Sequence, residues 1–585
     1  MDYGGTMMKK AVNWISKLLY AYLLLWIVPY LIEFKEDVSF TNNILCVGIY
    51  FVLLWLLNQY WEKFRNSERK NKFFLCFLSE SFLLALCIGK MLDVEGCINL
   101  KEWYQIASTL IGMPFVAMIL NQIYSMLKEN LKPAGNGQAI SRKEIIIYVL
   151  YLTVCWGIVL LGVYPGFFVY DATDEFTQVA SLTFTTHHPL FHVLYVGGLV
   201  QVGYKIFGTN NLAVFFFSSF QMFLFIAGIV YTAHKMSHFG FHKYFYRGMI
   251  ILMGIFPVYP MIALCSTKDS LFALVMLLWS VTTYEWFRFP TRFSCLKWII
   301  FSILLCQLRN NAIYALLVTG ILMIIIKKGN RKAITLSFLC VMFTSTLISN
   351  TMAIVLHADN QENQEILTVP IQQLTRIYKL SRDTYSAEEL QTLYKFLPEK
   401  CLNNYNPKLS DPVKIGFQNG VYEENPMEFW KLWVKMGAKA PMFYIDAWLM
   451  TSYGYWYPNT IVDVYKEKNI YKNNSYFGWK TEHPGYRDSK IPVVNEFYRK
   501  LSLEIYKEKI PVVAQLFSMG FLFWLMIFMM GFLLLTRGIH SITPYLLPLL
   551  VIATLLLGPT YLIRYVFFLW MIVPFLFADM CNTEA

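Results

Sequence analysis

One short loop between two apolar runs carries an unusual density of groups that exchange protons or bind ions. Its first part holds the acids Asp171, Asp174 and Glu175, and its second part holds the imidazoles of His187 and His188. A charged side chain at the edge of a bilayer is costly, so such a cluster indicates a functional site. We therefore expect the chemistry of this protein in the loop 165–188.

The three acids have a spacing that favours joint action. Asp171, Asp174 and Glu175 stand at i, i+3 and i+4, so a helix that begins here places them on one side. Close carboxylates raise one another's pKa or bind a divalent cation, and either property suits a base that takes a proton from a hydroxyl group. A solvated acidic loop without a catalytic role is the alternative.

The histidines that follow are suited to binding a phosphate group. His187, His188 and His192 lie around Pro189, which favours a helix start. An imidazole beside a helix N-terminus offers a phosphate both donors and the positive end of a dipole. Two alternatives stay open. One imidazole packs at the membrane interface, or the three histidines hold zinc, because His188 and His192 stand at i and i+4.

Further charges stand at the ends of other apolar runs. Lys268 and Asp269 lie between two such runs, Arg309 precedes two asparagines, and Arg564 follows a proline near the end of the chain. Taken alone, each of these residues is as compatible with a local ion pair as with a functional site. Because several cations and acids around one loop would bind an anionic lipid, we expect them to converge in one pocket.

An aromatic run gives a candidate for sugar binding. Tyr455, Trp456 and Tyr457 stand between Gly454 and Pro458. Aromatic faces stack on the C–H faces of sugars, so these residues are candidates for acceptor binding. The alternative is the belt of Trp and Tyr that membrane proteins place at the interface.

The composition places these residues in a membrane protein. Of 585 residues, 56% are apolar, 17% are aromatic and only 15% are charged. Spanning hydrocarbon takes roughly 20 apolar residues, and the first apolar run is read as a retained helix because no cleavage site follows it. The apolar runs cover residues 13–33, 43–61, 73–92, 104–127, 143–164, 188–207, 211–233, 247–266, 269–286, 294–309, 311–327, 333–356, 511–536, 543–558 and 560–579.

The distribution of charge indicates orientation and not a nucleic-acid partner. The net charge is +12, but it is roughly zero over residues 357–508, and the excess lies in short loops such as 63–72, 128–143 and 327–332. Short basic loops stay in the cytoplasm, whereas the loop 33–42 is acidic. The loop of Asp171 and the segment 357–508 then both lie on the extracytoplasmic side.

This orientation leaves one apolar run in excess. The basic residues 235–247 have to be cytoplasmic, so an odd number of crossings must separate them from His188. The run Pro189–Phe207 is the best candidate for a re-entrant or interfacial segment. We expect an all-α, polytopic helical bundle with about 14 transmembrane helices.

The segment 357–508 is predicted to be a mainly helical extracytoplasmic domain. Ser386 with Glu389 forms a capping box, and Asn425 with Pro426 marks a second helix start. Phe429, Leu432, Trp433 and Met436 follow at the spacing of one helical face, and a third helix is predicted over 495–507 with Phe497, Leu501 and Ile505 in register. The expected organisation is a four-helix extension (1–140), a transmembrane core (141–356), this domain (357–508) and C-terminal helices (509–585).

The order of these motifs resembles a known superfamily. Tyr164-Pro165-Gly166, Tyr170-Asp171, His188-Pro189, Lys268-Asp269 and Pro559 with Arg564-Tyr565 follow one another as in the GT-C polytopic glycosyltransferases. The closest likeness is to a bacterial branch related to the protein mannosyltransferases and the aminoarabinose transferase of lipid A. Pro370-Ile371-Gln372-Gln373 with Arg376, and Gly454–Pro458, are also similar to that branch. The resemblance covers roughly residues 145–580.

The resemblance implies an activity and roles for residues. Such enzymes transfer a sugar from a polyprenyl-phosphate donor to an acceptor, which here would be an envelope glycan, lipid or protein at the outer face of the cell membrane. Asp171 would be the base, with Asp174 and Glu175 as the other acids of the loop, and the donor phosphate would lie near His187, His188, Lys268, Arg309 and Arg564. Only some members require a cation such as Mg²⁺ or Mn²⁺. Protein mannosyltransferases carry adjacent Asp-Glu in this loop, whereas here Ala172 follows Asp171, so the identity of the base stays open among the three acids.

Two other function classes fit a polytopic chain. A transporter or flippase of a lipid-linked or small anionic substrate is the main alternative, and it predicts charges near the bilayer midplane. A scaffold for envelope assembly is the second. The gathering of charges at one face favours the enzyme.

Overall fold

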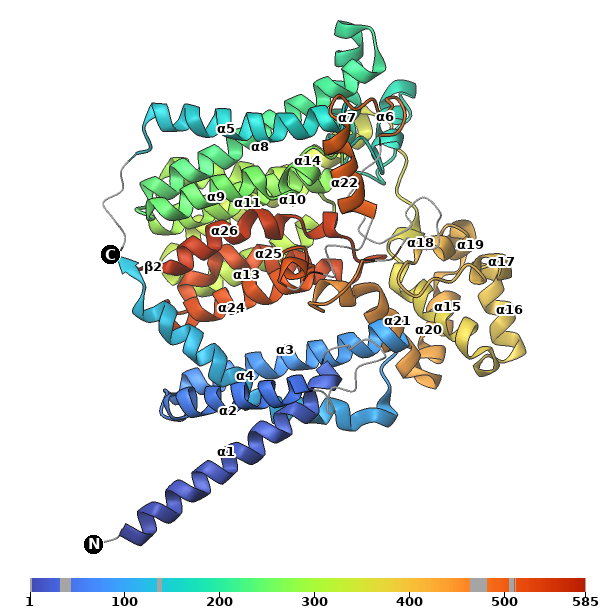
Figure 1. The fold of residues 1–585 in the computed structure, drawn as a ribbon. Coiled ribbons are helices and arrows are strands. Elements are labelled where there is room, and N and C mark those ends of the chain that lie inside the picture. The colour runs from blue at the N-terminus through green and yellow to red at the C-terminus, as the bar shows by residue number, and fades with distance from the viewer. Residues whose placement is uncertain are drawn as a thin grey trace. The chain divides into compact units, whose positions relative to one another are not determined.

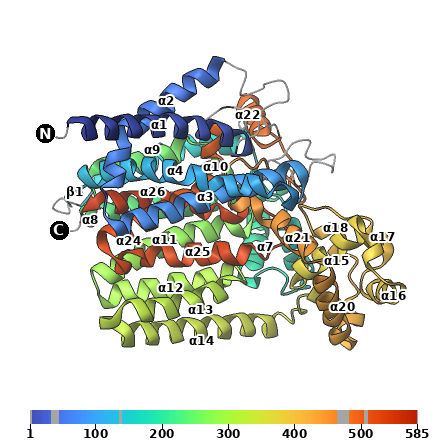
Figure 2. The same cartoon turned by 90° about the horizontal axis from the view of Figure 1, so that it is seen from below.

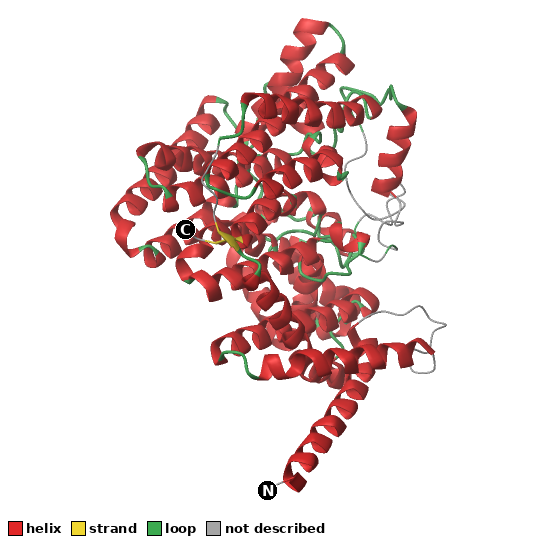
Figure 3. Cartoon of the chain, turned by 60° about the vertical axis from the view of Figure 1, so that its left-hand side comes forward, coloured by secondary structure: helices red, strands yellow, loops and turns green. Residues whose placement is uncertain are grey.

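The computed structural model describes residues 3–31, 44–133, 139–462, 464, 481–503, 510 and 512–583. The predicted acidic loop 33–42 lies outside these residues. The chain forms two compact units, one of residues 1–131 with 456–460 and the other of residues 132–455 with 461–585. Nearly all described elements are helices (Figure 3), and a pair of two-residue strands, β1 (Lys132–Pro133) and β2 (Asn582–Thr583), lies parallel in the second unit.

The first unit contains four long helices, namely α1 (Tyr3–Leu31), α2 (Ile44–Arg65), α3 (Arg69–Glu95) and α4 (Trp103–Glu129), with the short 3-10 helix η2 (Leu100–Glu102) before α4. Their apolar faces pack on one another, with Leu57, Leu83 and Met118 among the buried residues. Many other apolar side chains of these helices are exposed, as expected of helices that face lipid.

The second unit contains a bundle of membrane-type helices and a group of shorter helices at one end of it (Figures 1 and 2). The bundle is built from α5 (Arg142–Gly162), α8 (Asn210–His238), α9 (Lys243–Ile255), α10 (Val258–Ala263), α11 (Lys268–Arg288), α12 (Arg292–Leu308), α13 (Ala312–Ile326), η3 (Lys328–Asn330), α14 (Arg331–Val355), α23 (Val513–Leu516), α24 (Met519–Arg537), η8 (Ile539–Ile542), α25 (Thr543–Leu555), η9 (Ile563–Val566) and α26 (Phe568–Cys581). We call the end at which α11 begins the site end.

The shorter helices of the second unit lie at the site end. Two of them, α6 (Ala172–Ser181) and α7 (Leu190–Phe207), follow the loop of Asp171. Residues 357–455 form what we call the cap segment, with η4 (Asn363–Glu365), α15 (Thr368–Leu380), η5 (Arg382–Thr384), α16 (Ala387–Phe396), α17 (Glu399–Leu402), α18 (Asp411–Lys414), α19 (Asn419–Glu424), α20 (Pro426–Lys439), α21 (Pro441–Ser452) and η6 (Tyr453–Tyr455). The last, α22 (Pro492–Leu503), packs on α5 through Val494 and Gly162.

Eleven described helices are long and apolar enough to cross a membrane, so the chain is a multi-pass membrane protein with an all-α fold. Four of the predicted runs are not among them. The run 247–266 breaks into α9 and α10 at Phe256-Pro257, because a proline cannot continue the helical hydrogen bonds. The runs 294–309, 311–327 and 543–558 form helices below the length of the eleven. The predicted number of 14 crossings stays a prediction.

Helix α7 lies at the site end although its length suits a membrane span. Gln221 of α8 donates hydrogen bonds to the carbonyl oxygens of Ala263 and Cys265, at 2.6 and 2.7 Å, so this part of α8 is level with the start of α11. Tyr195 of α7 makes an edge-to-face contact with Phe217 of α8, close to the same level, with ring centroids 5.5 Å apart. Both views place α7 at the same end of the bundle as the cap segment (Figures 1 and 2). Since α7 is itself one of the eleven helices long and apolar enough to cross a membrane, the expectation that the run 189–207 does not cross stays a prediction.

The cap segment is helical, as predicted, and has its own core. The capping box of Ser386 and Glu389 is confirmed at the start of α16. Helix α20 begins at Pro426 and buries Phe429, Leu432 and Met436, so the predicted face is confirmed too.

The predicted third helix of the segment 357–508 is partly wrong. Helix α22 begins at Pro492, earlier than predicted, and Phe497 is 45% exposed while Tyr498 and Leu501 are buried. A different face of α22 is buried because the helix packs on α5. The local sequence pattern contains no information about this contact. Ile505 lies outside the described residues.

Candidate functional site

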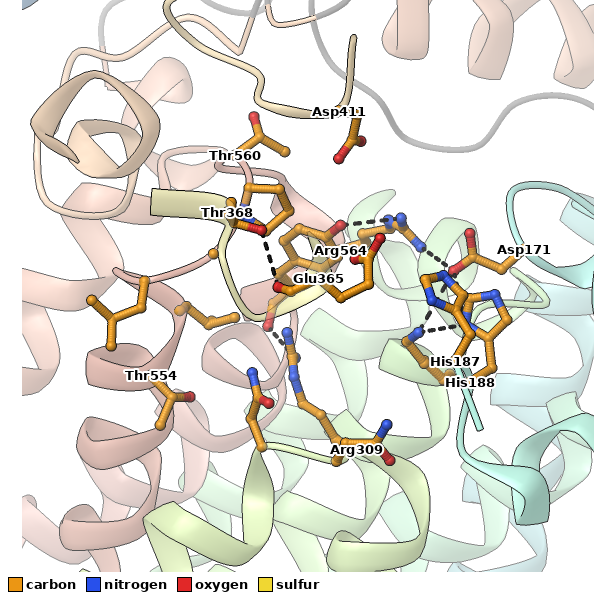
Figure 4. A pocket seen from close by; sticks show the side chains of 18 of the residues that line it. Asp171, His187, His188, Arg309, Glu365, Thr368, Asp411, Thr554, Thr560 and Arg564 are labelled. Carbon is orange, nitrogen blue, oxygen red and sulfur yellow. Dashed lines mark hydrogen bonds and ion pairs between the residues drawn. The ribbon is translucent and has the colours of Figure 1, made fainter. Parts of the chain in front are cut away.

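A polar cavity of about 460 Å³ lies at the site end of the second unit (Figure 4). One side, which we call the inner wall, comes from the loops before α6 and α7, the start of α11, the turn between α12 and α13, and η9. Its acidic, basic and imidazole side chains are those of Asp171, His187, His188, Lys268, Arg309 and Arg564. The opposite side, which we call the outer wall, comes from the cap segment between Gln361 and Ile415.

A strained turn presents Asp171 to the cavity. Tyr170 has a φ of 63°, a left-handed conformation that is uncommon for any residue other than glycine. The guanidinium carbon of Arg564 lies 4.3 Å from the centroid of the Tyr170 ring, a cation–π contact that helps to hold this turn. Asp171 then occupies the N-cap position of α6, but its side chain makes no capping hydrogen bond. The carboxylate is therefore available to the groups of the inner wall.

Three cationic or titratable groups gather on one carboxylate oxygen. Asp171 Oδ2 lies 3.5 Å from Arg564 Nη1, 3.8 Å from Lys268 Nζ and 4.0 Å from His188 Nδ1. Burial opposes the ionisation of Asp171, but the charges of Arg564 and Lys268 outweigh it and hold the pKa of this carboxyl well below its usual range. Asp171 is thus a carboxylate at neutral pH, and a weak base while both cations face it.

His188 is held as a neutral imidazole. Lys268 Nζ donates a hydrogen bond to His188 Nδ1 at 2.9 Å, which requires an unprotonated Nδ1. Burial and the charge of Lys268 lower the pKa of His188 to about 2. In this state the second ring nitrogen, Nε2, carries the proton and can donate a hydrogen bond.

Arg564 has unsatisfied donor capacity inside the protein. Its Nη1 contacts Thr267 Oγ1 at 3.3 Å, and its Nη2 contacts Tyr565 Oη at 3.3 Å. The residue is only 8% exposed, and its Nε has no hydrogen-bond partner among the described residues. A buried N–H without a partner is costly, so an anionic oxygen entering the cavity would find a favourable site here.

Arg309 lines the cavity but is bound to other groups. Its Nη1 lies 3.1 Å from Asp269 Oδ1 and donates a second hydrogen bond, also at 3.1 Å, to the carbonyl oxygen of Tyr565. These contacts join α11, α12 and η9. The structure therefore gives Arg309 a positioning role, in addition to the predicted proximity to a phosphate.

The outer wall contains a charged group that sequence reasoning missed. Lys414 Nζ lies 2.7 Å from Glu365 Oε2 and 3.0 Å from Asp411 Oδ1, and all three residues line the cavity. Burial alone would lower the pKa of Lys414, but Asp411 and Glu365 raise it above its usual value. The i, i+3 spacing of Asp411 and Lys414 was the only signal in the sequence, and it is too common to indicate a site.

Two of the three predicted acids do not line the cavity. Asp174 is exposed, and Glu175 is buried with its carboxylate 2.9 Å from His192 Nδ1, joining α6 to α7. The prediction that the three acids act together is wrong, because Glu175 pairs with His192 of α7 and Asp174 is exposed, so only Asp171 faces Arg564 on the inner wall. His192 likewise belongs to this structural pair.

The predicted metal ligands also do not come together. Among the described residues, no group of three or more His, Cys, Asp and Glu side chains is arranged to hold a metal ion. The set of Asp171, Asp174 and Glu175 is therefore not formed, nor is the alternative zinc set of His187, His188 and His192. His187 lines the cavity and is exposed.

The aromatic run does not form a stacking surface in the cavity. Tyr455 lines the cavity, but it is 1% exposed and its hydroxyl donates a hydrogen bond to the carbonyl oxygen of Thr560 at 2.9 Å. Trp456 and Tyr457 belong to the first unit, where Tyr457 lies against Gly89. The prediction that these three residues jointly stack on a sugar is wrong, because only Tyr455 lines the cavity and its ring is buried.

An apolar groove of about 590 Å³ lies among α7, α8, α11 and α12. Phe191 and Leu308 stand at one end of it, two positions after Pro189 and one before Arg309 of the polar cavity, and Tyr231 and Lys297 stand at the other. The part of α12 from Lys297 to Leu308 has a length of about 16 Å, at a rise of 1.5 Å per residue. A groove of this length is suited to a hydrocarbon chain.

The comparisons with known proteins place the chain in a family without giving it an activity. Residues 177–585 match a family described as a family of unknown function (DUF6020), and the chain belongs to this family. The match begins after Asp171 and includes the rest of the charged inner wall. No curated protein and no solved structure matches the chain.

Proposed function

We propose, because the family supplies no activity, that the cavity makes this protein a membrane glycosyltransferase of the GT-C type. It transfers a sugar from a polyprenyl-phosphate donor to an envelope glycan, lipid or protein acceptor on the extracytoplasmic side. The observation that carries the proposal is the meeting of Asp171 with Arg564 and Lys268, at 3.5 and 3.8 Å, in one polar cavity.

The chemistry needs a base and a phosphate site close together. The acceptor hydroxyl attacks the anomeric carbon, the bond from that carbon to the phosphate oxygen breaks, and the phosphate leaves with the electron pair. Asp171 accepts the hydroxyl proton, while Arg564 and Lys268 stabilise the charge that develops on the phosphate. His188, as a neutral imidazole, contributes a further donor.

The cation pairs of Asp171 fit this assignment. When a phosphate binds Arg564 and Lys268, its negative charge offsets their effect on the carboxyl, so the pKa of Asp171 rises and the carboxylate becomes a better base. Binding of the donor phosphate thus activates Asp171 as the base. Without a donor, Asp171 is kept ionised by the same cations and does not abstract protons from other hydroxyls.

The apolar groove supports a lipid-linked donor. A polyprenyl phosphate needs a polar site for its head and an apolar path for its chain. Phe191 and Leu308 of the groove lie within two positions of Pro189 and Arg309 of the cavity along the chain, which suits a donor whose head enters the cavity and whose chain enters the groove. A soluble nucleotide-sugar donor would have no use for this groove.

The proposal is tested by transfer assays in nanodiscs. Purified protein receives radiolabelled polyprenyl-phosphate sugars and envelope acceptors, and the Asp171→Asn variant is compared with the wild type. We expect the variant to lose transfer by about 10² to 10⁴-fold, the usual contribution of a general base. Asp174→Asn is the matched control, because Asp174 is exposed on the same turn, and it should retain transfer.

Two outcomes would contradict the proposal. Equal transfer by the wild type and Asp171→Asn removes Asp171 as the base. Flux of a lipid or small anion across sealed vesicles, with no transfer by the wild type, supports the transporter alternative instead.

A further inference from the structure

The outer wall differs from the inner wall in the sign of its charge. On the inner wall the cations Lys268, Arg309 and Arg564 exceed the acids that pair with them, Asp171 and Asp269. On the outer wall one ammonium group lies between two carboxylates. The cavity is therefore cationic where the bundle lines it and acidic where the cap segment lines it (Figure 4).

The outer carboxylates have free acceptor capacity. Lys414 uses Glu365 Oε2 and Asp411 Oδ1, and no described residue donates a hydrogen bond to Glu365 Oε1 or Asp411 Oδ2. Lys414 is 7% exposed and, with three donors, has one more than these two contacts use. Acceptors and a donor thus stand side by side in one wall.

The backbone holds this wall at a fixed place in the cavity. Ser410 donates its N–H to the carbonyl oxygen of Pro559 at 3.1 Å, and Thr560 Oγ1 donates to the carbonyl oxygen of Lys408 at 2.7 Å. Both contacts tie the start of α18 to the chain that leads into η9 and Arg564. The outer wall is thus connected to the phosphate-binding side through a short stretch of chain.

We propose that Glu365, Asp411 and Lys414 form a binding subsite for the vicinal hydroxyl groups of a neutral hexose. Each sugar hydroxyl both donates and accepts a hydrogen bond, so neighbouring hydroxyls match carboxylates that flank an ammonium group. A second phosphate would be repelled here, because two acids face one cation. The inference rests on the proposed function, which supplies the phosphate site across the cavity.

The hydroxyl groups can belong to the donor sugar or to the acceptor, and binding assays separate the two sources. Bare polyprenyl phosphate and the same lipid carrying glucose or mannose are bound to protein in nanodiscs. The variants are Glu365→Gln and Asp411→Asn, which preserve shape, and Glu388→Gln, an exposed acid on α16, is the matched control. Binding of the bare lipid reports on the phosphate site and shows that each variant is folded.

If the subsite holds the donor sugar, Glu365→Gln and Asp411→Asn weaken binding of the glycosylated lipid about tenfold and leave binding of the bare lipid unchanged. If it holds an acceptor sugar, donor binding stays unchanged and the KM for the acceptor rises about tenfold. Arg564→Gln should weaken both lipids equally, because it acts on the phosphate.

The inference is overturned if both outer-wall variants match Glu388→Gln in donor binding and in acceptor KM. In that case, normal binding of the bare lipid by the wild type leaves the proposed function in place. If the wild type binds neither lipid, the proposed function fails together with the subsite.

Discussion

Arg564 Nη1 lies 3.5 Å from Asp171 Oδ2, although 393 positions separate the two residues in the chain. The same guanidinium group covers the ring of Tyr170, the residue that turns the backbone before Asp171. The last part of the chain therefore both pairs with the candidate base and helps to set its position. An anionic substrate that binds Arg564 acts directly on this relationship.

Two replacements of Arg564 should weaken donor binding to different extents. Arg564→Lys keeps the charge but loses the planar pair of N–H donors of the guanidinium group, and we expect the KM for the donor to rise about tenfold. Arg564→Gln loses both the charge and these donors, and the KM should rise about 100-fold. Steady-state transfer with varied donor measures both. The control is Lys395→Gln, which removes an exposed ion pair with Glu428 and should change neither the donor KM nor the rate.

Arg309 should matter for stability more than for donor affinity. It forms a buried pair with Asp269, and removal of one partner of such a pair costs about 3–5 kcal/mol. We expect Arg309→Gln to lower the thermal midpoint of unfolding in nanodiscs and the double variant with Asp269→Asn to recover part of the loss. An unchanged midpoint together with a donor KM raised as far as in Arg564→Gln would instead assign Arg309 to the phosphate.

Stability should fall as the pH is lowered through the ordinary range of histidine. The folded pKa of His188 is about 2, below its value of 6.5 in the unfolded chain. The unfolded state therefore binds more protons between these values, and His188 should cost about 2 kcal/mol of stability between pH 6.5 and pH 5. Thermal unfolding across this interval measures the loss. His188→Asn should remove most of the dependence, and an equal slope in the variant would contradict the neutral assignment.

Filling the apolar groove should discriminate between donors by chain length. Ala227 lines the groove on α8, so Ala227→Trp occupies space that a polyprenyl chain would use. We expect transfer from a long-chain donor to fall about tenfold and transfer from a short-chain analogue to be retained. Ile300→Trp, on an exposed part of α12, is the control. Equal loss with both donors would show that the groove does not hold the chain.

Much of the architecture followed from local patterns. Apolar runs of the right length predicted the membrane helices, and the capping box of Ser386 and Glu389 predicted the start of α16, because both signals depend only on neighbours in the chain. The spacing of the three acids did not predict their surroundings, because Glu175 faces His192 of α7 whereas Asp171 faces Arg564. Packing between elements decides which neighbour each side chain meets, and the spacing along the chain does not contain it.

The sequence by itself determined that the chain spans a membrane many times, that its cap segment is helical, and which loop carries the candidate base. Only the tertiary structure decided that Arg564 and Lys268 face this base and that Glu365, Asp411 and Lys414 line the same cavity. The reason is that hydropathy and capping act over a few residues, whereas a site is assembled by packing between elements hundreds of positions apart. The hydrogen bonds of Ser410 and Thr560 to backbone carbonyl oxygens join the cap segment to the last part of the chain, and neither local sequence predicts them.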